Sequence, residues 1–456
     1  MTTPPPVTDR LLRPVASGLV LSALAFSPLA SADEPTAQAL QQALDRQQEQ
    51  LEQTQQALED LRTQIEEAAE IPTDRGPAWS GYAVINYSRI DFYQNVQDDE
   101  PDQRARTDLE RVVLEAEFEL ADGIEFETEI EFEHGGTGAT VEYESDEFGE
   151  YEQEIEKGGE VVIEKAELVI KRSPRINWRL GHIVVPFGMI NTHHLPSQYF
   201  TTTRSLAETA LIPAVWHETG AELFGRLGDL RYQFLVVTGL DSSGFSSQDW
   251  IAGGYQQRME YTNADNPAFV VRLDYVPTDG VVLGGAYYYG DTTDNRDQQN
   301  LEASGVVSMW EVHGRYERGP VTVRAEMIQG TVENSDLITA ANRNAVNQDV
   351  RGISATPVGH AAESYFVEAG YDLLSFFGKR TDRLDVFARY DAYNTMAEVE
   401  GSIQANPRYD RSAYTAGLNY KLRPDIVFKA EYSRLENEAE IANEADMFAL
   451  GLGVEF

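Results

Sequence analysis

The chain has 456 residues and a formal net charge of −40, with 76 Asp and Glu residues against 36 Lys and Arg residues. This excess of carboxylates excludes nucleic acid as a partner, because binding to phosphate groups depends on Lys and Arg. The polar mean hydropathy excludes a bundle of membrane helices, and the absence of cysteine excludes disulfides, thiolate metal sites and catalytic thiols. Two explanations of the acidity remain open: an acidic functional surface, or adaptation to a salty habitat.

Residues 1–32 have the pattern of a secretory signal peptide. Arg10 and Arg13 precede an apolar run, and Ala30-Ser31-Ala32 supplies the small residues of a cleavage site. The alternative is a retained anchor, but the run is shorter than a membrane-spanning helix requires. We therefore expect an exported protein that is cleaved after Ala32.

Residues 33–71 differ from everything that follows. Apolar side chains recur every seven residues, at Leu44, Leu51, Leu58 and Ile65, among Gln, Glu and Arg. This repeat predicts a short coiled coil, expected in the periplasm, and the alternative is an amphipathic helix packed on a globular partner. Pro72 and Gly76 mark residues 72–78 as a linker.

From residue 79 to 456 the period changes from seven to two. Residues 124–133 alternate apolar side chains with glutamates, which predicts a strand with one apolar face. The same pattern predicts sixteen strands, at residues 80–93, 108–120, 124–134, 160–172, 177–186, 217–227, 230–240, 267–276, 281–290, 306–318, 321–333, 363–374, 383–394, 412–422, 426–437 and 446–456.

The connections between these strands alternate between short and long. An even number of strands with turns at one end and long loops at the other is typical of outer-membrane proteins. We therefore predict an all-β fold, a sixteen-stranded antiparallel transmembrane β-barrel preceded by a short periplasmic coiled-coil helix. The last strand alternates and ends in Phe456, which is similar to the signal that the barrel-assembly machinery of Gram-negative bacteria reads.

A barrel of this size encloses water, so its polar face is expected to point inward, away from outer-membrane lipid. This rule predicts an acidic pore lining at Glu115, Glu117, Glu119, Glu125, Glu127, Glu129 and Glu131. It also predicts basic pore-lining residues at Arg272, Arg315, Arg324, Arg389 and Lys429. Two roles remain open for the basic residues: they form a wall that opposes the acidic one, or they pair with carboxylates and stiffen the barrel.

The long connection at residues 187–216 is expected to be a pore constriction loop. It contains His193, His194 and Arg204 but no Asp and only one Glu, although the chain as a whole is acidic. The alternative for the histidines is a place on the surface or in trimer contacts. A metal site is disfavoured because adjacent strand residues point in opposite directions and no carboxylate spacing completes a ligand set.

The motif around this loop resembles the phosphate-selective porin O and P family. The resemblance lies in Gly181, the run Pro186-Phe187-Gly188, the later Arg204-Ser205, and Gly220 on the returning strand. It implies a homotrimer of sixteen-stranded outer-membrane barrels that pass phosphate, other small anions or other solutes passively. The chain departs from that family's arginine ladder and lysine cluster, because it has six lysines and a glutamate-rich face.

The expected function is therefore that of an outer-membrane porin for passive diffusion of small hydrophilic solutes or ions, without enzymatic activity or a cofactor. The alternative is a structural protein that tethers the outer membrane to the cell wall through a closed barrel. An outer-membrane hydrolase would require a Ser–His pair, and the spacing of Ser205 and His193 does not indicate one.

Overall fold

The computed structural model describes residues 76–456, apart from 96, 99, 137, 146–150, 257–261, 297–300, 348–352 and 379, together with Gln56. The predicted signal peptide, the coiled coil except Gln56 and most of the linker lie outside the described residues. The chain divides into two units, residues 1–75 and 76–456, and only the second is considered below.

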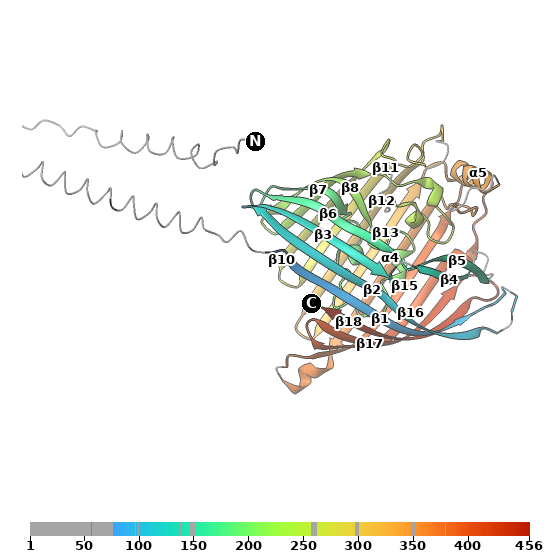
Figure 1. The fold of residues 1–456 in the computed structure, drawn as a ribbon. Coiled ribbons are helices and arrows are strands. Elements are labelled where there is room, and N and C mark those ends of the chain that lie inside the picture. The colour runs from blue at the N-terminus through green and yellow to red at the C-terminus, as the bar shows by residue number, and fades with distance from the viewer. Residues whose placement is uncertain are drawn as a thin grey trace, which may run out of the picture. The chain divides into compact units, whose positions relative to one another are not determined.

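The second unit is a closed barrel of sixteen antiparallel strands, which confirms the predicted fold (Figure 1). Consecutive barrel strands are neighbours, and β1 pairs with β18 to close the sheet. The strands are β1 (Ala78–Phe92), β2 (Asp102–Ala121), β3 (Ile124–Glu133), β6 (Val161–Lys171), β7 (Asn177–Val184), β8 (His217–Leu227), β9 (Leu230–Thr238), β10 (Pro267–Thr278), β11 (Val281–Asp291), β12 (Val306–Arg318), β13 (Val321–Val332), β14 (Ala361–Asp372), β15 (Arg383–Glu398), β16 (Asp410–Arg423), β17 (Ile426–Asn437) and β18 (Glu444–Glu455).

All sixteen predicted ranges correspond to these strands, and the largest difference is at the start of β2. That strand begins at Asp102 rather than at residue 108, because it continues to pair with β1 as far as the Phe92–Asp102 pair. The extension carries several charged residues, so the alternation of apolar and polar side chains did not reveal it.

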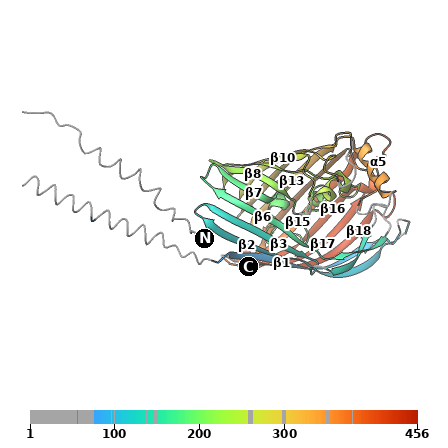
Figure 2. The ribbon, with the colours of Figure 1, turned by 45° about the horizontal axis from the view of Figure 1, so that its top comes forward.

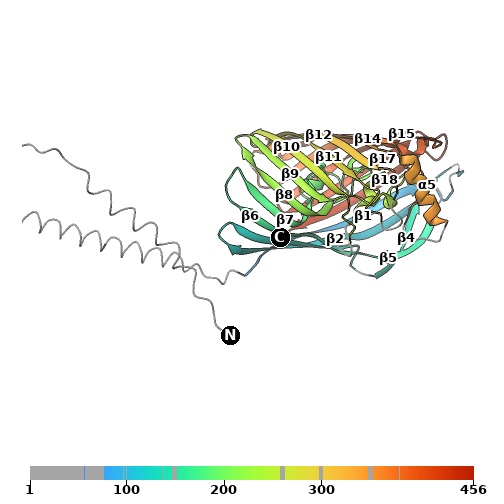
Figure 3. The same cartoon turned by 90° about the horizontal axis from the view of Figure 1, so that it is seen from above.

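The connections are short at one end of the barrel, called the turn end, and long at the other, called the loop end. The loop-end connections contain the hairpin β4 (Gly138–Ser145) and β5 (Tyr151–Gly158), and the helices α3 (Met189–Thr192), α4 (Leu206–Thr209) and α5 (Ser335–Val346). They also contain the short 3-10 helices η2 (Ser242–Gly244), η3 (Ala252–Gly254) and η5 (Pro407–Tyr409), whereas η4 (Leu373–Phe377) lies at the turn end. Figure 3 shows α5 at the same end of the barrel as β4 and β5. None of the helices in the described residues is long and apolar enough to cross a membrane.

The two faces of the barrel wall differ in exposure, as the period of two predicts. On β9, Phe234 and Val236 are exposed on the outside, whereas Leu235 and Val237 are buried on the inside. The strands cross the barrel at a marked tilt (Figure 2). The outer face therefore presents the apolar surface that contact with lipid requires.

Much of the interior near β8 to β14 is filled by apolar side chains. Inward residues of these strands, such as Tyr288 and Met309, pack with Phe245, Trp250 and Ile251 from the β9–β10 connection. The β7–β8 connection adds Val185, Phe187, Leu211, Ile212 and Trp216 to the same cluster. The loop-end half of this side thus contains a dry core, so an aqueous path does not run through it.

Candidate functional site: the lumen and its inward loop

The connection between β7 and β8, residues 185–216, folds into the lumen and is called the inward loop. Its local structure depends on one buried carboxylate, because Glu208 accepts hydrogen bonds from the backbone N–H groups of Ile190, at 2.8 Å, and Asn191, at 2.6 Å. Asn191 in turn donates its side-chain amide to the carbonyl oxygen of Val185 at 2.8 Å and accepts from the N–H of Trp216 at 2.6 Å. The two ends of the loop are therefore held together at the barrel wall.

The glycines of the family-like motif occupy positions where a side chain does not fit. Gly181 and Gly220 face each other on β7 and β8. A Cβ atom on Gly220 would lie 2.1 Å from the carbonyl oxygen of Val236, and one on Gly181 would lie 2.3 Å from that of Ala166. Gly188 has a φ of 87°, and a Cβ there would lie 2.5 Å from the Glu208 carboxylate. These glycines set how closely the strands and the loop approach each other.

Pro186 and Phe187 complete that motif at the point where the chain leaves β7. Both residues are buried, and the Phe187 ring packs edge-on against Trp216 with centroids 6.3 Å apart. The motif therefore turns the chain from the wall into the apolar core and fixes where the inward loop begins.

The far side of the inward loop is attached to strands near the C-terminus. Glu431 on β17 accepts hydrogen bonds from the backbone N–H of Thr202, at 2.9 Å, and from its hydroxyl, at 2.6 Å. Ser205, the N-cap of α4, donates its hydroxyl to Asp391 on β15 at 2.8 Å. The loop therefore spans the lumen, and charge-assisted hydrogen bonds fix both sides of it.

Four of the five predicted basic residues contact the inward loop. Arg272 donates to the carbonyl oxygen of Gly188 at 3.0 Å, and Lys429 donates to that of Thr201 at 2.7 Å. Arg389 donates to the Thr201 hydroxyl at 2.9 Å, and Arg324 stacks over the ring of Phe200 at 4.9 Å. The arginines also form ion pairs with carboxylates of their own wall, including Asp274, Glu311, Glu317, Glu368 and Asp391.

Arg315, the fifth, pairs in register with Arg324 and is half-buried. Among the described residues it takes part in no ion pair, and like charges directly opposite each other on neighbouring strands are unfavourable. It is thus the predicted basic residue with the most charge available to the lumen.

The predicted acidic residues share the inward face of β2 and β3. Glu115 lies opposite Glu129, Glu117 opposite Glu127 and Glu119 opposite Glu125. Lys165 on β6 forms ion pairs with Glu115, Glu127 and Glu129, and Lys171 pairs with Glu125. Glu131 is buried beside Arg111, with an N–O distance of 2.9 Å. Glu117 and Glu119 are exposed to the lumen and are the most accessible charges of this wall.

The two predicted histidines lie at the edge of the loop, near opposite walls. Burial, together with the positive charges of Arg315 and Arg272, lowers the pKa of His193 to about 3, so its imidazole is neutral at neutral pH. His194 donates Nδ1–H to the carbonyl oxygen of Asn191 at 3.0 Å, and its Nε2 lies 3.9 Å from a Glu129 oxygen. Within the described residues, no group of three His, Asp or Glu side chains is arranged to hold a metal ion.

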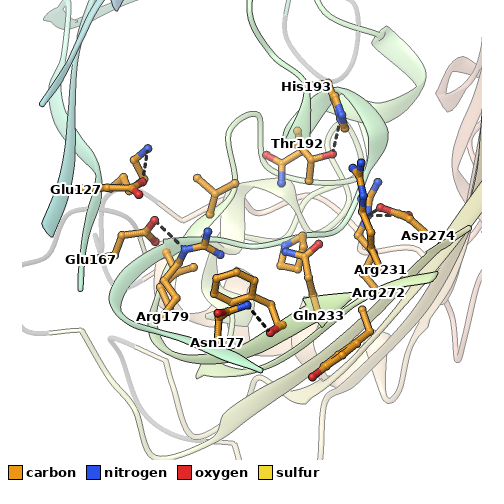
Figure 4. A pocket seen from close by; sticks show the side chains of 18 of the residues that line it. Glu127, Glu167, Asn177, Arg179, Thr192, His193, Arg231, Gln233, Arg272 and Asp274 are labelled. Carbon is orange, nitrogen blue, oxygen red and sulfur yellow. Dashed lines mark hydrogen bonds and ion pairs between the residues drawn. The ribbon is translucent and has the colours of Figure 1, made fainter. Parts of the chain in front are cut away.

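A cavity of about 540 Å³ lies between the inward loop and the turn end. Figure 4 shows Glu127 and Glu167 on one side of it and Arg231, Arg272 and His193 on the other. Arg179 forms an ion pair with Glu167 at 2.8 Å on the acidic side. The cavity, called the vestibule, is lined by charges of both signs and is wide enough for water and small solutes.

A second cavity, of about 360 Å³, adjoins the vestibule beside the β1–β18 seam. Tyr82, Leu195 and Phe456 line it, and Glu129 lines both cavities. The polar space of the lumen therefore extends along β1 to β3 and β6, away from the dry core.

Sequence reasoning missed several buried polar residues on that side. A register irregularity where β1 pairs with β2 turns both Glu110 and Arg111 inward, where they pair at 2.9 Å. A second one, between β3 and β6, turns both Glu164 and Lys165 inward. Such β-bulges interrupt the period of two. Two adjacent charged residues within a strand were the signal that could have revealed each bulge.

No family model matches the chain. A protein of Aquifex aeolicus (strain VF5), described as uncharacterized, is 24% identical over 356 residues, which cover 78% of this chain and 76% of that protein. Among solved structures, Salmonella typhi OmpF in complex with daunomycin aligns with a TM-score of 0.50 at 12% identity, over 83% of this chain and 97% of that one. The outer membrane channel DcaP of Acinetobacter baumannii aligns with a TM-score of 0.48 at 11% identity, over the same shares.

At these sequence identities, the similarity to the solved structures concerns the fold alone. The chain shares the closed antiparallel barrel of OmpF, and the inward loop and its anchors are features of this chain's own coordinates.

Proposed function

We propose that this protein is an outer-membrane porin through which small hydrophilic solutes diffuse passively. The single observation that carries the proposal is the polar vestibule, inside a closed barrel whose outer face is apolar and whose inner loop is fixed across the lumen. Such a pore selects by size and charge rather than by catalysis.

We also propose that the pore prefers cations. Most of the predicted basic residues are engaged by the inward loop or by carboxylates, whereas Glu117 and Glu119 remain exposed to the lumen. Among the predicted pore-lining residues, the exposed Glu117 and Glu119 therefore outweigh Arg315, the one basic residue for which neither an ion pair nor a hydrogen bond is found in the described part of the chain. Selective passage of anions such as phosphate, which the family resemblance implies, is the competing outcome.

Conductance of the purified protein in planar bilayers tests both statements. We expect a stable ohmic current. In a KCl gradient, we expect a reversal potential whose sign indicates selectivity for cations. A reversal potential of the opposite sign would show that Arg204 and Arg315 decide selectivity. Absence of current would favour the tethering protein with a closed barrel.

Further parts of the proposal rest on the strand pattern, on the terminal strand and on the family resemblance. We propose that the protein lies in the outer membrane of a Gram-negative bacterium as a homotrimer, with residues 33–71 in the periplasm. The terminal Phe456 is proposed to be read by the barrel-assembly machinery. Cross-linking in native membranes, followed by electrophoresis without heating, measures the oligomeric state.

A further inference from the structure

The connection between β14 and β15 differs from the other connections at the turn end. It spans ten residues, 373–382, whereas the others span two to five, and it contains η4, called the foot. Phe376 and Phe377 of the foot are 73% and 74% exposed, which makes them the most exposed large apolar residues that the structure describes. Apolar surface in water costs about 25 cal/mol per Å², so we expect these two rings to have a partner.

The foot has a fixed conformation, because side chains before and after it form hydrogen bonds. Asp372 accepts from the N–H groups of Leu374, at 3.0 Å, and Leu384, at 3.2 Å, which joins the start of the foot to β15. After the foot, Arg380 donates two hydrogen bonds to Asp382, at 2.7 and 2.8 Å. The exposure of the two rings is therefore a property of a well-bonded segment.

The foot lies against the outer face of the barrel. On β14, Tyr365 and Val367 are exposed on this face, whereas Phe366 between them is buried. Tyr371 is in the same phase as the exposed pair, and its ring contacts that of Phe376, with centroids 5.6 Å apart. Figure 1 shows the segment in orange, where it projects at the turn end. The apolar surface of the foot is therefore continuous with the lipid-facing surface of the strands.

Polar groups beside the foot mark where this apolar surface ends. Tyr420 on β16 donates its hydroxyl to Asp382 at 3.2 Å, while its ring stacks on the exposed Phe428 of β17, with centroids 6.4 Å apart. Aromatic rings with one apolar side and one hydrogen-bonded tip are typical of the boundary between membrane and water. The foot therefore lies at the depth where lipid headgroups meet acyl chains.

The small area of the foot favours lipid over another protein as its partner. A phenylalanine side chain buries about 150–250 Å². Two of them therefore supply less than the roughly 800 Å² per partner that a stable protein interface buries. Binding to lipid has no such minimum, because its strength increases with each apolar group that is buried.

We propose that the foot is a lipid anchor, which inserts Phe376 and Phe377 among the acyl chains of the periplasmic leaflet. The turns of outer-membrane barrels face the periplasm, so the partner is the phospholipid of that leaflet. This inference rests on the proposed place of the barrel in the outer membrane and does not require that the pore conducts.

Single cysteines labelled with an environment-sensitive fluorophore test the proposal, because the chain contains no cysteine of its own. Phe377→Cys is the test variant. Val367→Cys, on the outer face of β14, is the control for contact with lipid, and Asp279→Cys, in the exposed β10–β11 turn, is the control for contact with water. Each variant is reconstituted in vesicles of phosphatidylcholine and phosphatidylglycerol that carry a nitroxide either near the headgroup or near the chain end.

The label at residue 377 is expected at a depth of about 5–10 Å in the boundary between headgroups and acyl chains. The shallow nitroxide is therefore expected to quench it more strongly than the deep one, and aqueous iodide is expected to leave it bright. The label at residue 279 is expected to be quenched by iodide and not by either nitroxide.

Quenching of the label at residue 377 by iodide alone would overturn the lipid anchor. If the label at residue 367 is still quenched by lipid, the place of the barrel in the membrane stands, and if it is not, that part of the proposed function fails too. Excimer emission between pyrene labels at residue 377 would show a contact between copies of the chain and would also overturn the anchor. Conductance of the same vesicles in KCl reports separately on the pore, and a heat-dependent shift in electrophoretic mobility verifies that each variant is folded.

Discussion

The two sides of the lumen are built on opposite principles. Toward the loop end of β9 to β14, inward residues and the loop segments that cover them are largely apolar, with Trp216, Trp250 and Tyr288 fully buried. Along β1 to β3 and β6, inward residues are carboxylates interleaved with a few cations. The first side resembles the core of a soluble domain and contributes stability. The second side carries polar groups, and their contribution to stability depends on contact with water and solutes. The comparison implies that mutations on the two sides are expected to affect different measurements.

The largest effect is expected from Trp250→Ala on the apolar side. Trp250 is fully buried and donates its indole N–H to the carbonyl oxygen of Gly359 at 3.0 Å. Loss of this ring is expected to lower the free energy of unfolding by about 3–5 kcal/mol, measured by urea unfolding in lipid vesicles. Trp310→Ala, on the outer face of β12, is the matched control and is expected to cost no more than about 1 kcal/mol. Equal losses of stability in the two variants would show that the apolar side chains packed around Trp250 do not form a core.

Gly220→Ala is expected to have the next largest effect, at the base of the inward loop. The added Cβ would lie 2.1 Å from the carbonyl oxygen of Val236, so β8 and β9 must separate. We expect a loss of about 1–3 kcal/mol in the same unfolding measurement. Gly314→Ala on β12 is the control, because its Cβ would meet nothing closer than 3.4 Å. A stable Gly220 variant would show that the close approach of β7, β8 and β9 is not required.

Ser205→Ala is expected to loosen the boundary between the two sides. The substitution removes the N-cap of α4 and leaves Asp391 without the hydroxyl at 2.8 Å. A loss of about 1 kcal/mol is expected, together with larger fluctuations of single-channel current because the loop moves more. Ser402→Ala, at an exposed position in the β15–β16 connection, serves as the control. Unchanged current noise would contradict the role of Asp391 as a loop anchor.

The smallest effect concerns the titration of His193. Its pKa is lowered to about 3 in the folded protein, below the ordinary value of about 6.5, so the unfolded chain binds the proton first. The contribution of His193 to the free energy of unfolding is therefore fully present above the ordinary pKa of about 6.5. It decreases as the pH falls, by about 0.7 kcal/mol between pH 7 and about pH 6. His193→Gln is expected to remove this part of the pH dependence of unfolding. A variant with the same pH profile as the unmodified protein would mean that His193 is accessible and protonated.

The barrel was predictable from the sequence because each strand carries its own evidence. Alternation fixed all sixteen strands, and the same rule placed Glu115 to Glu131 on one inner face. The attachments of the inward loop were not predictable, because Glu431 and Thr202 are separated by 229 residues and nothing local to either indicates the other. The buried carboxylates Glu110 and Glu164 were missed for a different reason. Each lies at a register irregularity, which reverses the face that alternation assigns.

The attachment of the inward loop also has a consequence for folding. Its partners Asp391, Lys429 and Glu431 lie on β15 and β17, far along the chain from residues 201–205. Contacts of such long sequence separation form late, because the entropy of closing the intervening chain must be lost first. The loop therefore settles only after the final strands are in place. An incompletely closed barrel would remain without its internal barrier, so appearance of the native conductance would report that assembly has finished.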